Sequence, residues 1–219
     1  MPKQVDHDKR RLAFAAAAYR VITRRGLGGA TVREIAKEAG FTTGALVHYF
    51  RTKDEILIRA SEYGALIVRK RMEHQASDHQ GLDALRHVLF ESLPLTPEMR
   101  GNWNVWLGFW DRSAHSAAIR KLTKERYDEW IGRIVGLIDG AKAAGELSER
   151  IKSETAAQAI VALIDGIGVR VLLTGISISP ARQKEMVDEC LNLLSTPRKL
   201  KAPVKRRKPA RKKIQSSLD

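Results

Sequence analysis

Apolar residues recur at helical spacing along most of the chain, and the strict alternation typical of β-strands is absent. Within residues 31–40, for example, Val32, Ile35, Ala36 and Ala39 follow the i, i+3, i+4, i+7 pattern of a one-sided helix. Similar patterns, broken at glycines and prolines, continue to residue 194. They predict an all-α protein of about nine helices. These lie at about 6–25, 31–39 and 43–49, from 52 toward Gly81, through Leu85, Val88 and Leu89, and at about 98–113, 116–143, 153–174 and 180–194.

The segment 31–53 carries the start and stop signals of two short helices joined by a tight turn. Thr31 with Glu34 is the sequence pattern of a capping box, which predicts a helix start at Thr31. Gly40 can adopt the left-handed conformation that ends a helix, and Thr42 is the expected N-cap of the second one. Two short helices in this order are the layout of a helix-turn-helix, which predicts binding to duplex DNA.

Lys53 lies in the first turn of a third helix, which Thr52 and Glu55 open with a second capping pattern. A lysine at a helix N-terminus opposes the helix macrodipole, so helix stability does not favour it. A bound DNA phosphate would favour a lysine there, because backbone N–H groups and the ammonium group would converge on one anion. A solvated lysine is the alternative, but directly after a helix-turn-helix we favour the phosphate contact.

Positive charge is concentrated at the two ends of the chain. Residues 1–60 contain 12 Lys and Arg against 6 Asp and Glu, residues 61–197 contain 17 against 18, and residues 198–219 contain 10 against 1. This distribution suits a DNA-binding head on a body that binds something else. The proline-containing basic tail cannot bury a core and is expected to be disordered. It is a solvated run, a DNA-binding arm or an import-like stretch, and we favour the arm.

The predicted helix at 153–174 is apolar on all sides, and such a helix is buried on all sides. A second copy of the chain is the simplest cover, so this helix and the last one predict a four-helix dimer interface. Full burial within one subunit is the alternative. The predicted interface residues are Ile160, Leu163, Ile164, Ile167, Val171, Val187, Leu191 and Leu194.

Trp103, Trp106 and Trp110 lie at i, i+3 and i+7 of one helix. Core packing explains such rings, and so does an aromatic box for a cationic or planar effector; one ring can serve both purposes. The candidate effector-pocket residues are Trp103, Trp106, Phe109, Trp110, Tyr127 and Trp130. Asp165 and Arg170 interrupt the apolar helix, where they pair with each other, cap the pocket or pair across the dimer.

Motifs for catalysis and metal binding are lacking. No G-x-S-x-G, H-E-x-x-H or phosphate-cradling glycine loop occurs, and the histidines at 74, 79, 87 and 115 show no evident metal-ligand spacing. We expect no enzyme activity, no cofactor and no metal. The single cysteine, Cys190, excludes an intrachain disulfide and suits a reducing cytoplasm. Without a signal region or a long apolar span, we expect a soluble, cytoplasmic, nucleoid-associated protein with no membrane partner.

Residues from about 10 to 60 resemble the DNA-binding domain of the TetR family of bacterial transcription regulators. The matching segments are T-V-R-E-I-A-K-E-A-G at 31–40, G-A-L-V-H-Y-F at 44–50 and T-K-D-E at 52–55. V-W-L-G-F-W at 105–110 and A-L-I-D-G-I-G-V-R at 162–170 are similar to the C-terminal domain of the choline-responsive betaine-pathway repressors. The resemblance implies an all-helical dimer with its second short helix in the major groove and a C-terminal ligand domain.

Carried over position by position, the resemblance also implies which residues contact DNA. These are Thr31, Tyr49 and Lys53 for phosphate, and Thr42, Thr43, Gly44, Ala45 and His48 for bases or the sugar-phosphate chain. Val47 stands where the family usually has tyrosine. A hydroxyl contact to phosphate is therefore missing, although Val47 can pack on a thymine methyl group.

The sequence thus predicts a helix-turn-helix domain at 1–52, a helical effector-binding and dimerisation domain at 53–195 and a disordered basic tail at 196–219. The expected function is a ligand-responsive transcription regulator, of repressor type, that binds a pseudo-palindromic operator as a homodimer. An unidentified small-molecule effector would release it. The alternatives are a sequence-independent architectural DNA-binding protein that relies on the tail, and a helical-bundle enzyme that acquired a basic tail.

Overall fold

The protein is all-α in this computed structural model, as predicted, and the structure describes residues 2–175 and 177–195. The helices of these residues are α1 (Pro2–Gly29), α2 (Val32–Ala39), α3 (Thr43–Tyr49), α4 (Lys53–Asp78), α5 (Gly81–Ser92), α6 (Pro97–His115), α7 (Ala117–Ala143), α8 (Ser153–Leu173) and α9 (Pro180–Leu194). The predicted tail at 196–219 lies outside the described residues. The first helix runs longer than predicted, although Gly26, where its end was expected, does interrupt it with a φ of 69°.

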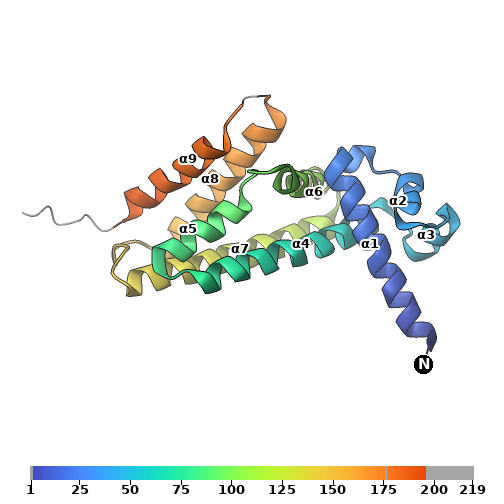
Figure 1. Ribbon diagram of the computed structural model, residues 1–219, viewed down its shortest axis with the longest axis horizontal. Coiled ribbons are helices and arrows are strands. Elements are labelled where there is room, and N and C mark those ends of the chain that lie inside the picture. Colours follow the sequence, from blue (N-terminus) through green and yellow to red (C-terminus); the bar gives the residue numbers. More distant parts are fainter. Residues whose placement is uncertain (1, 176, 196–219) are drawn as a thin grey trace, which may run out of the picture.

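The long helix α1 and the short helices α2 and α3 form a head at one end of the molecule (Figure 1). Phe14 and Ile22 of α1, Ile35 of α2 and Leu46 of α3 are fully buried in its core. Leu57 of α4 belongs to the same cluster. The boundary predicted between residues 52 and 53 therefore falls at the start of a helix whose first turns pack with the head.

Threonine hydroxyl groups cap the N-termini of α2, α3 and α4, as the capping patterns predict. The Thr31 hydroxyl accepts a hydrogen bond from the backbone N–H of Glu34 at 3.2 Å. In the same way, Thr42 accepts one from Ala45 N–H at 3.2 Å, and Thr52 accepts one from Glu55 N–H at 3.1 Å. Gly40 ends α2 in the left-handed conformation, with a φ of 75°. These local signals give the head its two short helices, because each cap satisfies a backbone donor that the helix leaves free.

In a capping box the glutamate also accepts a hydrogen bond from the backbone N–H of the N-cap threonine, and this second bond is not formed as expected at either Thr31 or Thr52. The Glu34 carboxylate pairs with Arg25 of α1, and Glu55 Oε2 accepts a hydrogen bond from the backbone N–H of Arg51 at 3.0 Å. Glu34 therefore fastens α2 to α1, because its oxygen lies closer to an arginine of the packed neighbour than to its own cap residue.

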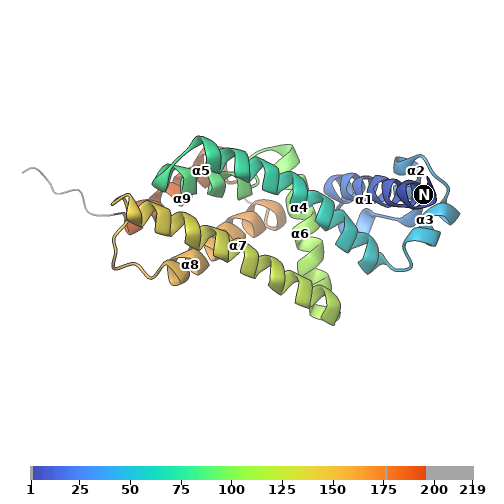
Figure 2. The same ribbon diagram turned by 90° about the horizontal axis from the view of Figure 1, so that it is seen from below.

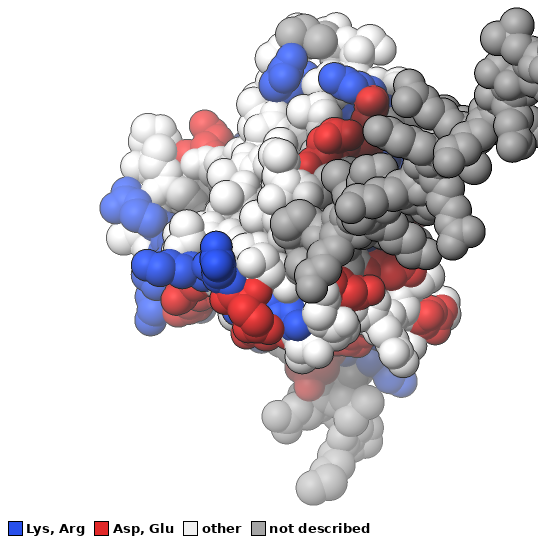
Figure 3. Space-filling model, turned by 90° about the vertical axis from the view of Figure 1, so that its left-hand side faces the viewer, with Lys and Arg blue, Asp and Glu red and all other residues white. Residues whose placement is uncertain are grey.

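The body consists of α4 to α9, and α4 runs from the head along its length (Figures 1 and 2). Its own core is built around Leu85 and Leu89 of α5, Ile134 and Ile138 of α7, and the buried face of α8. On the end of the body away from the head, acidic and basic side chains are intermixed (Figure 3). This mixture matches the nearly balanced charge of residues 61–197.

The helix α8 packs against α6, α7 and α9 of its own chain, which corrects most of the predicted dimer interface. By length and composition it could also cross a membrane, a test that core helices of other proteins pass as well. Five of the predicted interface residues are at most 2% exposed in the single subunit and so have no surface left for a second chain: Ile160, Ile164, Ile167, Val187 and Leu191. The other three, Leu163, Val171 and Leu194, are half-buried.

Candidate nucleic-acid interface and ligand pocket

The helix α3 presents one polar face to solvent and one apolar face to the head. Leu46 and Phe50 are buried, whereas Val47 is 56% exposed and His48 is exposed beside it. The other predicted DNA contacts that are exposed are Thr31, Thr42, Thr43, Gly44 and Lys53. A seven-residue helix with its outer face free, capped at its N-terminus by a threonine hydroxyl, has the size and polarity to enter a major groove.

Tyr49 and Ala45, the remaining predicted contacts, are half-buried. The Tyr49 ring lies 4.5 Å from the ring of His7 and 5.3 Å from that of Phe14, both on α1. These contacts set the position of the last turn of α3 on α1. Tyr49 therefore combines a packing role with any contact to phosphate.

Basic side chains of the head divide into a paired and an unpaired group. Arg20 and Arg24 of α1 donate hydrogen bonds to Glu38, and these bonds hold the pKa of Glu38 below its usual value. By contrast, no ion pair within 4.0 Å is found among the described residues for Arg33, Lys37, Arg51 or Lys53. Cations without an acidic partner are free to contact phosphate. Arg33 and Arg51 were not among the predicted DNA contacts, because a sequence does not show which arginines pair with an acidic residue in the fold.

A cavity of about 200 Å³ lies in the body between α4, α6, α7 and α8. All six candidate effector-pocket residues line it: Trp103, Trp106, Phe109, Trp110, Tyr127 and Trp130. Trp103 and Phe109 are also buried in the cores, so the two explanations of the aromatic helix hold together. The spacing of the tryptophans places them on the side of α6 that faces the cavity.

The aromatic rings are held in place by contacts with one another and with the backbone. Trp103 and Trp110 meet edge to face with ring centres 6.0 Å apart, and Trp106 lies 6.2 Å from Tyr127. Trp103 Nε1 donates a hydrogen bond to the carbonyl oxygen of Ser92 at 3.0 Å. Fixed rings of this kind form a preorganised surface for a cation or an apolar group.

Three acidic residues, Glu91, Glu129 and Asp165, line the cavity, and Asp165 is bound to one of its aromatic residues. The Tyr127 hydroxyl donates a hydrogen bond to Asp165 Oδ2 at 2.7 Å. Burial raises the pKa of Asp165, and burial together with this carboxylate raises the pKa of Tyr127. No ion pair joins Asp165 to Arg170 in the described residues; of the roles left open for them, Asp165 lines the cavity, and Arg170 is exposed.

Arg126 lines the same cavity and was not predicted from the sequence. Its guanidinium group lies 5.8 Å from the centre of the Phe109 ring and donates a hydrogen bond to Ser61 Oγ at 3.2 Å. Burial lowers its pKa, and among the described residues its buried Nε has no hydrogen-bond partner. A ligand or water at this end of the cavity would satisfy that donor.

The helix α6 contacts the head with one side and the cavity with another. The Tyr19 hydroxyl of α1 donates a hydrogen bond to Asn102, and Asn104 Nδ2 donates one to the carbonyl oxygen of Thr23 at 2.9 Å. At the end of α6, Arg112 Nε donates to Asp54 of α4 at 2.8 Å. A displacement of α6 by something in the cavity would thus reach both α1 and the start of α4.

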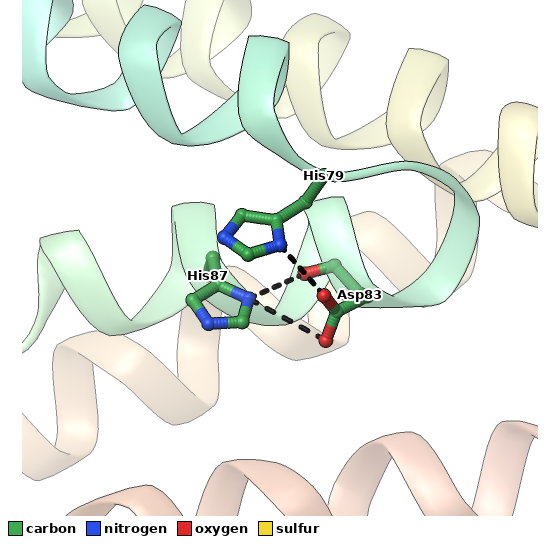
Figure 4. Close-up of side chains that lie close together, drawn as sticks. All are labelled: His79, Asp83 and His87. Carbon is green, nitrogen blue, oxygen red and sulfur yellow. Dashed lines mark hydrogen bonds and ion pairs between the residues drawn. The ribbon is translucent and has the colours of Figure 1, made fainter.

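The histidines require a second correction. His79, Asp83 and His87 place their ligand atoms within 4.8 Å of one another (Figure 4), contrary to the prediction that His79 and His87 lack metal-ligand spacing. The signal was present as H-x3-D-x3-H. The three residues span a break between two helices, so helical spacing alone does not predict that they come together.

Both parts of the chain match known families. Residues 15–60 match the family described as bacterial regulatory proteins, tetR family. Residues 81–195 match the family described as BetI-type transcriptional repressor, C-terminal. The two matches cover the helix-turn-helix head and the greater part of the body.

Relatives and solved structures agree with these families. The HTH-type transcriptional regulator PksA of Bacillus subtilis is 30% identical over 192 residues, which are 85% of this chain and 90% of PksA. The HTH-type transcriptional regulator BetI of Burkholderia thailandensis is 27% identical over 208 residues, or 90% of this chain and 100% of BetI.

Among solved structures, a transcriptional regulator from Saccharomonospora viridis in complex with choline shares the fold. It has a TM-score of 0.74 at 24% identity, covering 86% of this chain and 98% of its own. A transcriptional regulator from Rhodococcus sp. RHA1 has a TM-score of 0.73 at 24% identity, covering 84% and 95%. The chain therefore belongs to the TetR family of bacterial transcriptional regulators, with a BetI-type repressor domain after its helix-turn-helix, and is a DNA-binding regulator rather than an enzyme.

Proposed function

We propose that the protein is a cytoplasmic, nucleoid-associated repressor that binds a pseudo-palindromic operator as a dimer and is released by a small organic cation. The observation that carries this proposal is the position of α6, with tryptophans at the cavity and Asn102 and Asn104 against α1. An effector that binds better when α6 is displaced would lower the affinity of the head for DNA by the same factor.

On the DNA side, α3 enters a major groove and Lys53 contacts phosphate at the start of α4. The exposed Val47 meets a thymine methyl group, whereas His48 and Thr43 reach base edges or the sugar-phosphate chain. Two heads must read grooves about 34 Å apart, or a multiple of that distance, on one face of the duplex. Small rotations of the heads would remove this match.

On the effector side, the cavity offers aromatic faces and the Asp165 carboxylate, a combination that favours a quaternary or other organic ammonium ion. The choline bound to the Saccharomonospora viridis regulator supports this class of ligand. Burial raises the pKa of Asp165, and a cation bound beside the carboxylate would favour its charged form and so lower that pKa.

For the dimer, the exposed face of α8 is the candidate interface. It carries the small residues Ala159, Ala162 and Gly166, with Leu173 63% exposed at its end. On α9, Leu193 is 87% exposed. Small residues allow close approach of a second helix, and exposed leucines on neighbouring helices mark an interaction surface.

The experiment measures DNA binding and its release with one matched set of ligands. An operator is first selected from random duplexes, and its affinity is followed by fluorescence anisotropy as ligands are added. Choline and tetramethylammonium should weaken DNA binding and raise the thermal unfolding midpoint. The uncharged analogue of choline, 3,3-dimethylbutanol, should have a smaller effect on both quantities. If the uncharged analogue or simple carboxylates act as strongly as the cations, the proposed ligand class is wrong.

A version that ends at Ser195 tests the architectural alternative. The regulator should keep a discrete footprint without residues 196–219, with weaker affinity and a smaller salt dependence if the tail contacts phosphate. Diffuse binding that disappears with the tail would instead support sequence-independent coating of DNA.

A further inference from the structure

A cluster of two histidines and one aspartate lies at the corner between α4 and α5, away from both the head and the ligand cavity (Figure 4). His79 follows the last residue of α4, Asp83 is in the first turn of α5, and His87 is one turn further along α5. His79 Nδ1 lies 2.7 Å from Asp83 Oδ2. His87 Nδ1 lies 2.9 Å from the backbone carbonyl oxygen of Asp83 and 3.5 Å from Asp83 Oδ1, so it must leave the carbonyl oxygen to bind an ion. Two imidazole nitrogens thus face one carboxylate.

The fold holds this arrangement in place. Gly81 takes a φ of 55°, and the backbone N–H of Leu82 donates a hydrogen bond to Glu146 Oε2 at 2.6 Å, which fixes the turn between the helices. The imidazole rings of His79 and His87 stack 3.7 Å apart with an angle of 5° between their planes. The nitrogen lone pairs lie in the ring planes, so the rings must rotate out of this stack before both nitrogens point at one ion.

Competing contacts of the carboxylate can be released. Arg86 Nη1 lies 3.2 Å from Asp83 Oδ1, but Arg86 Nε donates a shorter bond, of 2.7 Å, to Asp188 of α9. The guanidinium group therefore keeps an acidic partner when Asp83 turns toward a metal. The histidines and Asp83 are each partly exposed, so an ion can reach them from solvent.

We propose that His79, Asp83 and His87 bind a divalent transition-metal ion of the Zn²⁺, Co²⁺ or Ni²⁺ class. Two imidazoles and one carboxylate are borderline ligands suited to these ions rather than to Mg²⁺ or Ca²⁺. With ligand bonds of about 2 Å, a tetrahedral ion needs ligand atoms little more than 3 Å apart, closer than the present limit of 4.8 Å. Three protein ligands leave one position for water, and the ion would fasten the end of α4 to α5.

The test uses the full-length protein without an affinity tag and stripped of metal. Co²⁺ is added and followed by visible absorption, and Zn²⁺ affinity is measured by competition with a chromophoric chelator. We expect one ion per chain and a higher thermal unfolding midpoint. His79→Gln, Asp83→Asn and His87→Gln should each weaken binding by more than about tenfold, since even loss of an outer partner costs about 10- to 100-fold.

His74→Gln is the matched control. His74 and Asp78 lie in the last turns of α4 with Nδ1 and Oδ2 3.5 Å apart, but they belong to no cluster of three donors in the described residues. This variant should bind metal like the parent, and so should Cys190→Ser. Circular dichroism checks that each variant folds. Binding that survives His87→Gln, binding lost in either control, or no binding by the parent at tenfold excess of metal over protein overturns the proposal.

Discussion

Asp165 affects the stability of the fold and, in the proposed function, also the binding of the effector. Its pKa is raised by burial, so the folded protein holds this proton more tightly than the unfolded chain does. The ionised group is therefore unfavourable to folding above the unfolded pKa of about 3.9, and this effect levels off once the pH exceeds the folded pKa. A cation bound beside the ionised Asp165 carboxylate would offset this loss of stability.

We predict that Asp165→Asn raises the free energy of unfolding by up to about 1 kcal/mol at pH 7, a modest figure because the group keeps some solvent contact. An asparagine oxygen can still accept the hydrogen bond from Tyr127. The gain should disappear below about pH 4, where both states are protonated. The same variant should bind organic cations about tenfold more weakly, the loss of one charge-assisted contact.

Denaturant titrations at several pH values and calorimetric binding of choline test both halves of this prediction. Glu154→Gln, which removes an exposed carboxylate from the first turn of the same helix, is the control for general charge effects. Destabilisation of Asp165→Asn at pH 7, with unchanged cation binding, would show that the carboxylate has a purely structural role.

Lys53 is the residue whose role in DNA binding is easiest to isolate, because it has no acidic partner within 4.0 Å in the described residues. We predict that Lys53→Ala weakens binding to every DNA sequence alike. The slope of log affinity against log salt should become shallower by about 0.9 per subunit, or about 1.8 for a dimer on one operator. Lys121→Ala, an exposed lysine of α7, should leave the slope unchanged. An unchanged slope in Lys53→Ala would mean that Lys53 is only solvated.

At the scale of elements, α6 contacts both the cavity and the head, and we propose that it couples the two. Asn104 faces α1 through its hydrogen bond to Thr23 and does not line the cavity. Asn104→Ala should therefore leave the effector affinity of the DNA-free protein within about twofold. The ratio of effector affinities without and with operator should fall by about 2- to 10-fold, the worth of one net hydrogen bond.

This ratio is measured by calorimetry with choline, in the presence and absence of saturating operator. Asn192→Ala, which alters an exposed asparagine of α9, is the control. An Asn104→Ala protein that keeps the full ratio would show that coupling runs through other contacts, such as the pair of Arg112 and Asp54.

The elements also show what the sequence could predict. Helix starts at Thr31, Thr42 and Thr52 were predictable because each cap depends on residues within three positions. The tryptophans of the cavity were predictable because one helix spaces them. The partner that covers each face of α8 could not be predicted, because the sequence of an apolar helix does not reveal which neighbour buries each side. Arg126 was missed for a related reason: its environment comes from α4 and α6, far away in the chain.

For the whole molecule, the decisive question is how two heads are held at the spacing of an operator. Among the described residues of one subunit, none covers the exposed face of α8 with Ala159, Ala162 and Gly166, and Leu173 and Leu193 extend the apolar surface. If this surface joins two subunits, a charge at its centre must be desolvated without a partner, which is strongly unfavourable.

We predict that Ala162→Glu converts the dimer to a monomer, as measured by sedimentation velocity at micromolar concentration. Because the second head then no longer binds at high effective concentration, operator affinity should fall by about 100-fold or more, while binding to a half-site should change little. Ala118→Glu, which places the same charge on an exposed position near the start of α7, should remain dimeric and bind the operator like the parent. A dimeric Ala162→Glu protein with parental operator affinity would place the interface elsewhere and leave the exposed face of α8 to another partner.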